Sequence, residues 1–259
     1  MKRLTCLLVC VGLLRAVCGE AETISIGYWN HKPHQYLSAD GSTRGAAITH
    51  FTMMAANMGV DVEWVGPLPF VRLVNALRDG SVDGSVSYGS HKSGLGDFVY
   101  SGDQPTFLSY AVLVVRADNP LTQIASIQDV KGYRIGWLEG VEPSLFLRRH
   151  LASVQIDYIT PSDTMWEQSL KKLLLGRIDA IHELNEYTLI AAAKELGVAD
   201  QIKVLRLPEP GEPVFVVFSK QSPNGKLLLE KYNAAQAAAP FSQADYENLV
   251  RQELETLKK

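Results

Sequence analysis

The chain has 259 residues, 46% hydrophobic and 20% charged, with 20 glycines and 12 prolines, so disordered, collagen-like and low-complexity classes are excluded. This length suits one large domain or two ordinary domains. A formal net charge of −3 leaves no broad basic field, and we therefore expect no nucleic-acid partner.

The segment 1–21 has the pattern of a cleaved secretory signal. It starts with two basic residues, continues with a short apolar run and ends in candidate cleavage sites: Lys2 and Arg3, Leu7–Leu14, and 17–21. The run is shorter than the ~20 apolar residues of a membrane span, and Arg15 interrupts it. We expect export to the periplasm, and lipidation of Cys18 is the alternative interpretation.

All the cysteines of the chain lie within this segment, at positions 6, 10 and 18. A mature chain cut after this segment contains none. This excludes disulfide bonds, thiolate catalysis and cysteine-ligated zinc in the exported protein. The fold must then be held by its hydrophobic core alone.

Strand-like and helical patterns alternate through the rest of the chain. The first half predicts strands at 23–28, 60–65, 82–87 and 110–115, and helices at 45–58 and 70–80. The second half predicts strands at 133–138, 155–159, 178–182, 202–207 and 213–218, and helices opening at Pro143 and covering 165–175, 185–196, 225–238 and 242–257. This alternation predicts an α/β fold with parallel sheets.

One short pattern occurs twice. Segments 77–84 and 173–180 both read Leu-x-x-Gly-x-(Val/Ile)-Asp-(small), which places a helix end, a glycine and a buried strand in sequence. The two aspartates are Asp83 and Asp179. Chance can produce such a pair, but two similar α/β lobes are the simplest interpretation.

Two facing lobes would place polar residues in a shared cleft. Ligands of open α/β sheets bind beyond the carboxyl ends of the strands, which the repeated pattern locates after each aspartate. Segment 87–92 follows the first, and segment 183–185 follows the second. The first segment would supply hydroxyl groups, an aromatic ring and cations, and the second would supply a carboxylate and an amide. Together these groups suit a small polar ligand.

Several further motifs occur in a defined order. They are an aromatic–proline turn at 27–34, Asp40–Gly45 before a helix, Phe70 ahead of the first repeat, Tyr100-Ser101 before Pro105, and Ile127–Gly132 leading into a strand that ends at Gly140. In this order and spacing the chain resembles the periplasmic solute-binding proteins of family 3, the polar amino-acid type that serves ABC importers. The resemblance covers nearly all of the chain after residue 21.

The resemblance implies a two-lobed type II periplasmic binding protein, with each lobe a mostly parallel sheet flanked by helices. It implies one lobe from 22–112 with 212–259, a second from 113–211, and crossings near 110–116 and 205–213. The implied function is capture of a small polar solute in the interlobe cleft for an ABC permease. We expect a monomer with no catalytic residue, no cofactor and no metal.

The resemblance also implies ligand-binding residues. In lobe one, Phe70 matches the family's stacking ring, and serines match its small polar positions; the full set is Trp29, His31, Phe70, Ser87, Tyr88, Ser90 and Lys92. In lobe two, a helix start would offer backbone N–H groups; the full set is Leu138, Gly140, Glu142, Glu183 and Asn185. The aromatic residues also fit a core, and the serines also fit simple turns.

Two departures from the family bear on the ligand. The arginine that grips an α-carboxylate is matched by Leu95, with Lys92 nearby, and the acid that grips an α-amine is matched by Leu184, beside Glu183. A lysine lacks the planar fork of an arginine. We therefore expect a ligand other than a standard α-amino acid. The aromatic rings and carboxylates of the predicted site suit a cationic ligand equally well.

Three alternatives stay open. An enzyme of the same fold, such as a cyclohexadienyl dehydratase, could use Glu142, Glu183, His91 and His182 as acid–base groups, although His182 is better explained as a structural residue within a strand. A metal site could use His31, His34, His50 and His91, although solvated loop histidines explain them better. A membrane sensor could replace the permease as the partner.

Overall fold

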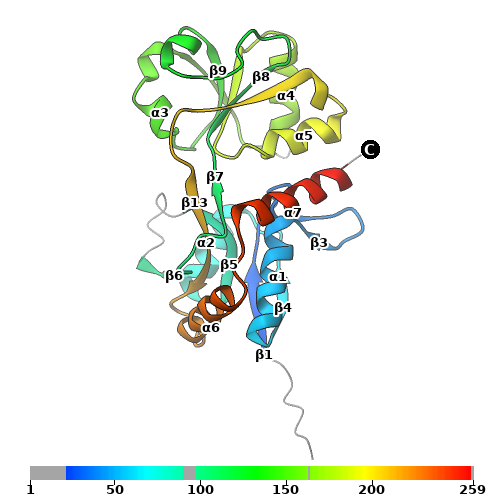
Figure 1. Ribbon diagram of the computed structural model, residues 1–259, viewed down its shortest axis with the longest axis vertical. Coiled ribbons are helices and arrows are strands. Elements are labelled where there is room, and N and C mark those ends of the chain that lie inside the picture. The colour runs from blue at the N-terminus through cyan, green and yellow to red at the C-terminus, as the bar shows by residue number, and fades with distance from the viewer. Residues whose placement is uncertain (1–21, 90–96, 163, 258–259) are drawn as a thin grey trace, which may run out of the picture.

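The structure, a computed structural model, describes residues 22–89, 97–162 and 164–257. Two α/β lobes lie at opposite ends of the long axis, with strands β7 (Phe107–Ser109) and β13 (Glu212–Ser219) at the waist between them (Figure 1). No helix in these ranges has the length and apolar character to span a bilayer. The predicted two-lobed α/β fold is confirmed.

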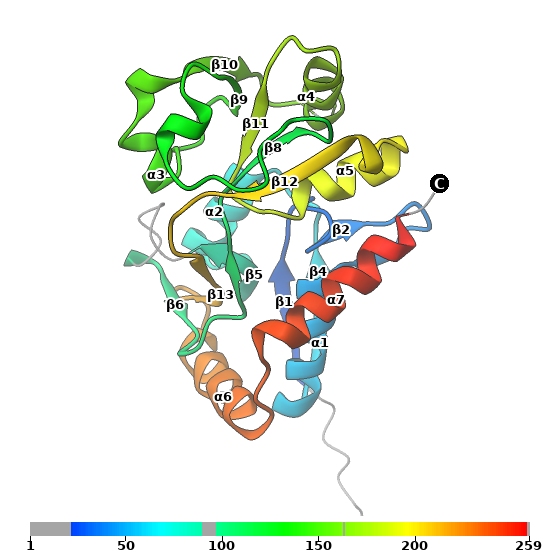
Figure 2. The same cartoon turned by 45° about the horizontal axis from the view of Figure 1, so that its top comes forward.

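Lobe one is built on a six-stranded sheet in the order β4-β1-β5-β13-β6, with β7 paired to β13. Its other strands are β1 (Glu22–Gly27), β4 (Val60–Val65), β5 (Gly84–Gly89) and β6 (Val99–Ser101). Its helices are α1 (Ala46–Met58), α2 (Phe70–Asp79), α6 (Gly225–Ala238) and α7 (Gln243–Thr256). A small hairpin, β2 (Tyr36–Leu37) and β3 (Thr43–Arg44), lies beside α7 (Figure 2).

Lobe two has a five-stranded sheet in the order β10-β9-β11-β8-β12. The strands are β8 (Val112–Arg116), β9 (Arg134–Leu138), β10 (Gln155–Ile159), β11 (Ala180–Glu183) and β12 (Ile202–Arg206). The helices are α3 (Leu145–Arg148), α4 (Met165–Leu174) and α5 (Thr188–Leu196). Short 3-10 turns occupy Ile127–Val130, Leu151–Ser153 and Ala199–Gln201.

Both sheets are mixed. The strands of the alternating units, β4-β1-β5 and β10-β9-β11, run parallel. The strands that carry the chain across the waist run antiparallel to their neighbours, β8 against β11 and β12, and β13 against β5, β6 and β7. The sequence pattern predicted mostly parallel sheets because an alternation of strands and helices does not reveal the direction of a returning strand.

Strand β8 shows why lobe two needs a continuous apolar run. Val112, Leu113, Val114 and Val115 are all fully buried. Leu113 and Val115 belong to one hydrophobic cluster, and Val112 and Val114 to another on the opposite face. A strand covered on both faces cannot alternate with polar residues, so this run forms the centre of the lobe.

The repeated aspartates perform the same task in both lobes. The backbone N–H of Asp83 donates to the Ser25 carbonyl at 2.8 Å, and its carboxylate accepts from the Ser25 N–H at 2.8 Å. Asp179 makes the same pair of contacts with Arg134, also at 2.8 Å each. Each aspartate thus joins the incoming strand to its parallel neighbour, and the two lobes share this local design.

The turn that precedes α1 is fixed by the first amides of that helix. Ala46 and Ala47 donate their N–H groups to the carbonyls of Pro33 and His34 at 3.0 and 2.9 Å. Gly45, between the turn and the helix, has φ of 129°, and a Cβ there would lie 2.2 Å from the His34 carbonyl oxygen. Only glycine fits this contact, which positions the turn at the waist.

Gly45→Ala is therefore expected to lower the free energy of unfolding by about 2–3 kcal/mol, because the new methyl group adds a clash to a backbone region that is nearly reserved for glycine. The matched control is Gly41→Ala, where φ is 82° and a Cβ meets nothing within 4 Å. That change should cost only about 1 kcal/mol. Urea denaturation of both variants measures the difference, and equal losses would contradict the role assigned to Gly45.

Candidate ligand-binding site

The site predicted from the sequence lies where the two lobes face each other. Strand β1 runs from the free end of lobe one toward lobe two, so the residues that follow its carboxyl end reach the waist (Figures 1 and 2). Glu183 ends β11 and Leu138 ends β9 in lobe two. The carboxyl ends of these strands supply the side chains described below.

Aromatic rings form a row on the lobe-one side. The ring of Trp29 stacks on His31 at 5.7 Å with planes 13° apart, and meets Phe70 edge-on at 5.3 Å. The His31 ring lies 5.0 Å from that of His34. Phe70 is 46% exposed, so it forms the rim of the row and is not a core residue. The structure thus brings together Trp29, His31 and Phe70.

The far end of the aromatic row touches lobe two. His34 Nε2 lies 3.0 Å from Asn185 Oδ1, and His31 Nε2 lies 3.1 Å from the Thr188 hydroxyl oxygen. The other nitrogen of His34 is 2.8 Å from the Tyr246 hydroxyl of α7. A neutral imidazole, with one donor and one acceptor nitrogen, satisfies both neighbours of His34.

Both histidines are held in the neutral form. Burial lowers the pKa of His34 to about 4, against an opposing hydrogen bond to Asn185. Burial, with the charge of His34 as a smaller cause, lowers the pKa of His31 to about 3. The interpretation of these residues as solvated loop histidines is wrong for His34, which is fully buried between Phe107 and Tyr246.

Helix α5 of lobe two packs against lobe one. Ala191, 1% exposed, belongs to the hydrophobic cluster of lobe one, and Tyr187 and Ile190 pack against that cluster. At the surface, Lys32 Nζ pairs with Glu195 Oε1 at 2.5 Å. The lobes are therefore in direct contact on the α5 side through apolar packing, hydrogen bonds and an ion pair.

Glu183 is the carboxylate at the sheet edge of lobe two. One carboxylate oxygen accepts from the Leu184 N–H at 2.8 Å, and among the described residues no cation pairs with it. Burial raises the pKa of Glu183 to about 7, and backbone hydrogen bonds from Leu184 and Asn185 partly oppose this shift. Glu183 is half-buried, and a carboxyl group with a pKa near neutrality is a typical feature of a functional site.

Neither a protein-family model nor a curated protein matches the chain. Solved structures do. The second substrate-binding domain of Lactococcus lactis GlnP, in an open conformation, matches with TM-score 0.68 and 20% identity over 91% of this chain and 97% of that one. An ancestral arginine-binding protein bound to glutamine matches with TM-score 0.64 and 22% identity over 90% and 98%. The chain has the type II periplasmic binding protein fold.

A periplasmic domain of another protein shares this fold. The VFT2 domain of Bordetella pertussis BvgS matches with TM-score 0.68 and 16% identity over 89% of this chain and 92% of that domain. Sequence identities this low establish the fold of the chain and not the identity of its ligand.

The second lobe of this periplasmic binding fold departs from the sequence expectation at its first loop. Gly140 adopts φ of 82° with open space at its Cβ position, but α3 begins only at Leu145. Glu142 is exposed and pairs with Arg148 at 2.6 Å. Leu138 packs at the edge of a hydrophobic cluster. The helix predicted to open at Pro143 therefore begins two residues later, with Ser144 as its N-cap.

Two of the first amides of α3, those of Phe146 and Leu147, are bonded within the protein. The Phe146 N–H donates to a Glu209 carboxylate oxygen at 2.5 Å, and the Leu147 N–H donates to the Ser144 hydroxyl at 3.3 Å. The Ser144 N–H donates to His182 Nε2 at 3.2 Å. His182 is thus a buried structural residue, and the expected backbone donors for a ligand are used by Glu209 and Ser144.

Asn185 joins elements and leaves little of its amide for a ligand. Its oxygen accepts from the Tyr187 N–H at 2.9 Å and from His34, and its nitrogen donates to the Ser109 hydroxyl at 3.0 Å. The Ser109 hydroxyl in turn donates to the Leu184 carbonyl at 2.9 Å. Asn185 therefore fastens lobe two to the crossing strand β7 and to the aromatic row.

Some predicted residues cannot be compared with the structure. Ser90 and Lys92, with the alternative acid–base residue His91, lie outside the described residues, and so do the side chains of Ser87 and Tyr88. Within the described ranges no group of three or more His, Cys, Asp or Glu side chains is placed to hold a metal ion.

A brace at the waist was not predicted. Arg206, at the end of β12, makes two hydrogen bonds with the Glu186 carboxylate at 2.5 and 2.8 Å. The same guanidinium lies 3.9 Å from the centroid of the Tyr110 ring, on the other crossing. The three residues are distant in sequence and match no local motif, so only the fold reveals them.

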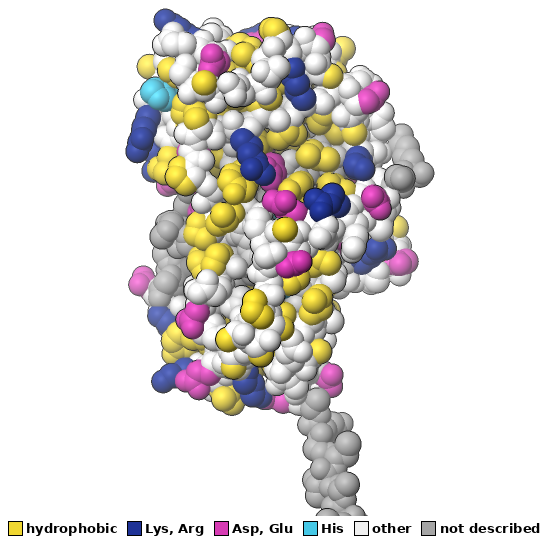
Figure 3. All heavy atoms as spheres, in the orientation of Figure 1, with side chains coloured by type: hydrophobic (Ala, Val, Ile, Leu, Met, Phe, Trp, Pro, Cys, Tyr) yellow, Lys and Arg dark blue, Asp and Glu magenta, His cyan; other side chains and the backbone are white. Residues whose placement is uncertain are grey.

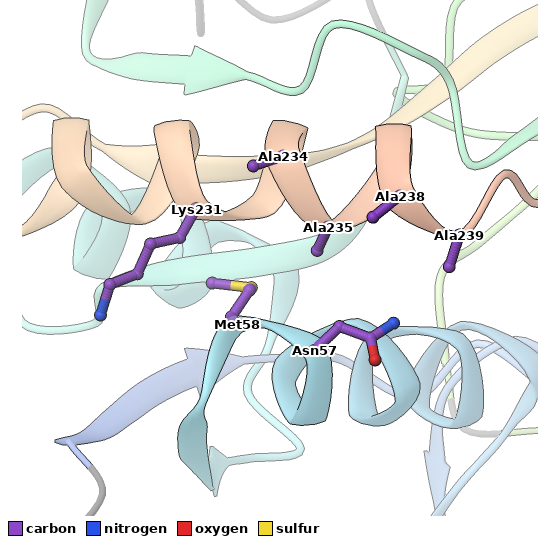
Figure 4. Close-up of a pocket in the computed structure, with 7 residues that line it drawn as sticks. All are labelled: Asn57, Met58, Lys231, Ala234, Ala235, Ala238 and Ala239. Carbon is purple, nitrogen blue, oxygen red and sulfur yellow. The ribbon is translucent and has the colours of Figure 1, made fainter.

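A groove of about 420 Å³ between α1 and α6 is unrelated to this site (Figure 4). Its walls include Met58, Lys231 and four alanines of the α6 region: Ala234, Ala235, Ala238 and Ala239. Met58 adjoins the strand end that pairs with Glu22, the start of β1. The groove therefore lies at the opposite end of lobe one from the waist.

Proposed function

We propose that the protein is an exported solute-binding protein that captures a small polar molecule between its lobes and delivers it to an ABC permease. The observation that carries this proposal is that the aromatic row Trp29–His31–Phe70 and the Glu183 carboxyl group occupy the facing ends of the two lobes. Rings and one polar group are typical of a pocket for a small ligand.

The structural neighbours support the same class. They include an amino acid ABC transporter substrate-binding protein from Streptococcus pneumoniae bound to L-arginine, together with the GlnP domain. The face in Figure 3 mixes acidic and basic side chains among hydrophobic ones, without a broad field of either sign. This surface favours a small solute over a polyanion as the partner.

The test is to purify the protein from its native compartment, denature it and identify released small molecules by mass spectrometry. We expect one small polar compound in near-stoichiometric amount, and the refolded protein should bind it again in a calorimetric titration. Its intact mass should also show loss of the segment 1–21. A protein that releases nothing and binds no member of a broad metabolite panel would contradict the proposal.

We further propose that the bound molecule leaves chemically unchanged. Incubation with prephenate and arogenate, the substrates of the enzyme alternative, should return both compounds intact. Turnover of either compound that depends on Glu183 would favour the enzyme over the solute-binding protein.

A membrane sensor is the second candidate partner. The lobe contacts made by α5 fit a domain that reports its closed or open state to a membrane partner. Deleting the gene separates the two candidates. Loss of uptake of the identified solute supports the permease, whereas normal uptake with an altered transcriptional response supports the sensor.

A further inference from the structure

Resting on the proposed function, the geometry points to a ligand class: an organic ammonium or guanidinium ion that carries no carboxylate beside its charge. The aromatic row would hold its body, and Glu183 would neutralise its charge. Within residues 22–89, 97–162 and 164–257, this assignment rests on the occupied amides of α3, on the paired cations near the waist and on Glu183.

The place where lobe two could hold an anion is filled by the protein itself. The Glu209 carboxylate, from the crossing between β12 and β13, accepts the Phe146 N–H at 2.5 Å. Ser144 takes the next amide, that of Leu147. Free N–H groups at a helix start attract anions, and here an internal carboxylate already satisfies that demand. A carboxylate of the ligand would be repelled by Glu209.

Three cations near the waist are also paired. Lys32 pairs with Glu195 at 2.5 Å, Arg148 with Glu142 at 2.6 Å, and Arg206 with Glu186 at 2.5 Å. Arg72 lies two residues beyond Phe70 on α2, about 200° around the helix from that ring, so it points away from the aromatic row. A bidentate grip on a carboxylate needs a guanidinium aimed at the ligand, and none of these four cations supplies it.

Glu183 has the opposite character. It is half-buried at the carboxyl edge of the lobe-two sheet and pairs with no cation of the described residues. It lies two residues from Asn185, which contacts His34, and the row continues through His31 to Trp29. A carboxylate that is partly withdrawn from water is stabilised by a positive partner, and a ligand cation against these rings provides one while gaining cation–π attraction.

The test uses matched pairs of probes that differ only by a carboxylate: agmatine against arginine, cadaverine against lysine, and tetramethylammonium against glycine betaine. Calorimetric titration should show at least one amine probe that binds about tenfold or more tightly than its carboxylate partner. Glu183→Gln should weaken that amine by about tenfold or more, because the charge is lost while the shape is kept. Glu167→Gln, at an exposed carboxylate of α4 that pairs with Lys171 and lies outside the predicted site, should leave it unchanged.

The pH profile separates a direct charge contact from a merely structural one. Since the pKa of Glu183 is about 7 before binding, amine affinity should rise between pH of about 6 and about 8 in the native protein and stay flat in Glu183→Gln. Glu209→Ala removes the carboxylate that accepts the Phe146 N–H. The ratio of agmatine affinity to arginine affinity should therefore fall in this variant. Arg72→Ala should change neither affinity.

Tighter binding of the carboxylate member in all three pairs, or an unchanged amine affinity in Glu183→Gln, would overturn the ligand class. Failure of every probe at millimolar concentration would overturn it as well. None of these results touches the solute-binding function itself, which is judged by the compound that the purified protein releases.

Discussion

Ala191→Glu is expected to separate the two lobes. Ala191 is 1% exposed within the lobe-one cluster, although it belongs to α5 of lobe two. A glutamate at this position would bury an unpaired charge in the lobe contact, at a cost of about 3–5 kcal/mol that opening of the lobes relieves. Small-angle X-ray scattering should then show a larger radius of gyration, while circular dichroism stays that of a folded α/β protein.

The control for this change is Glu195→Ala on the same helix. It removes the exposed ion pair with Lys32, a contact worth about 0.2–1 kcal/mol, and should leave the radius of gyration unchanged. If Ala191→Glu unfolds the chain, the milder Asn185→Ala is the second variant. It removes the hydrogen bond to His34 and should increase the open fraction by a smaller amount. An unchanged radius in both variants would contradict a packed lobe contact.

Acidification should weaken the same contact. The pKa of His34 is about 4 and that of His31 about 3 in the closed arrangement, whereas both return toward 6.5 when the rings are exposed. The open form therefore binds more protons between pH 6.5 and 4, and the closed arrangement loses stability as the pH falls through this range. The loss stays below about 3 kcal/mol for His34, because Phe107 and Tyr246 of lobe one still cover its ring when the lobes open.

Scattering measured across this pH range should show the lobes separating below pH of about 6 in the native protein. His34→Gln keeps a polar side chain without the titration, and its radius of gyration should vary less with pH. His50, fully buried in lobe one with its pKa lowered to about 4 by burial, titrates within one lobe. His50→Gln should therefore alter the pH dependence of the melting temperature and leave lobe separation as in the native protein.

The lobes could be predicted from the sequence because their signals are local. The apolar run of β8 and the two Asp-containing repeats each lie within a few consecutive residues. The short strands β2, β3, β6 and β7 were not predicted, since two or three residues cannot display an alternating pattern. The antiparallel return of β8 and β13 also depends on neighbours distant in the chain.

The site was predictable only in part for the same reason. Trp29, His31 and Phe70 come together because α2 follows β4 closely, as the resemblance implied. The burial of His34 could not be foreseen, because Tyr246 and Asn185 cover it from 212 and 151 positions away. Glu209 reaches Phe146 across 63 positions, and no spacing rule marks that contact.

The brace of Arg206, Glu186 and Tyr110 has a kinetic consequence. A Cβ on Gly211 would lie 2.9 Å from the Tyr110 ring, so the two crossing segments are in contact at the hinge about which the lobes open and close. For the lobes to open, the Arg206 guanidinium must break its contacts with the Tyr110 ring and the Glu186 carboxylate. We expect substitutions at this joint to alter how quickly a captured molecule escapes, while the rate of first encounter, set by diffusion, stays nearly constant.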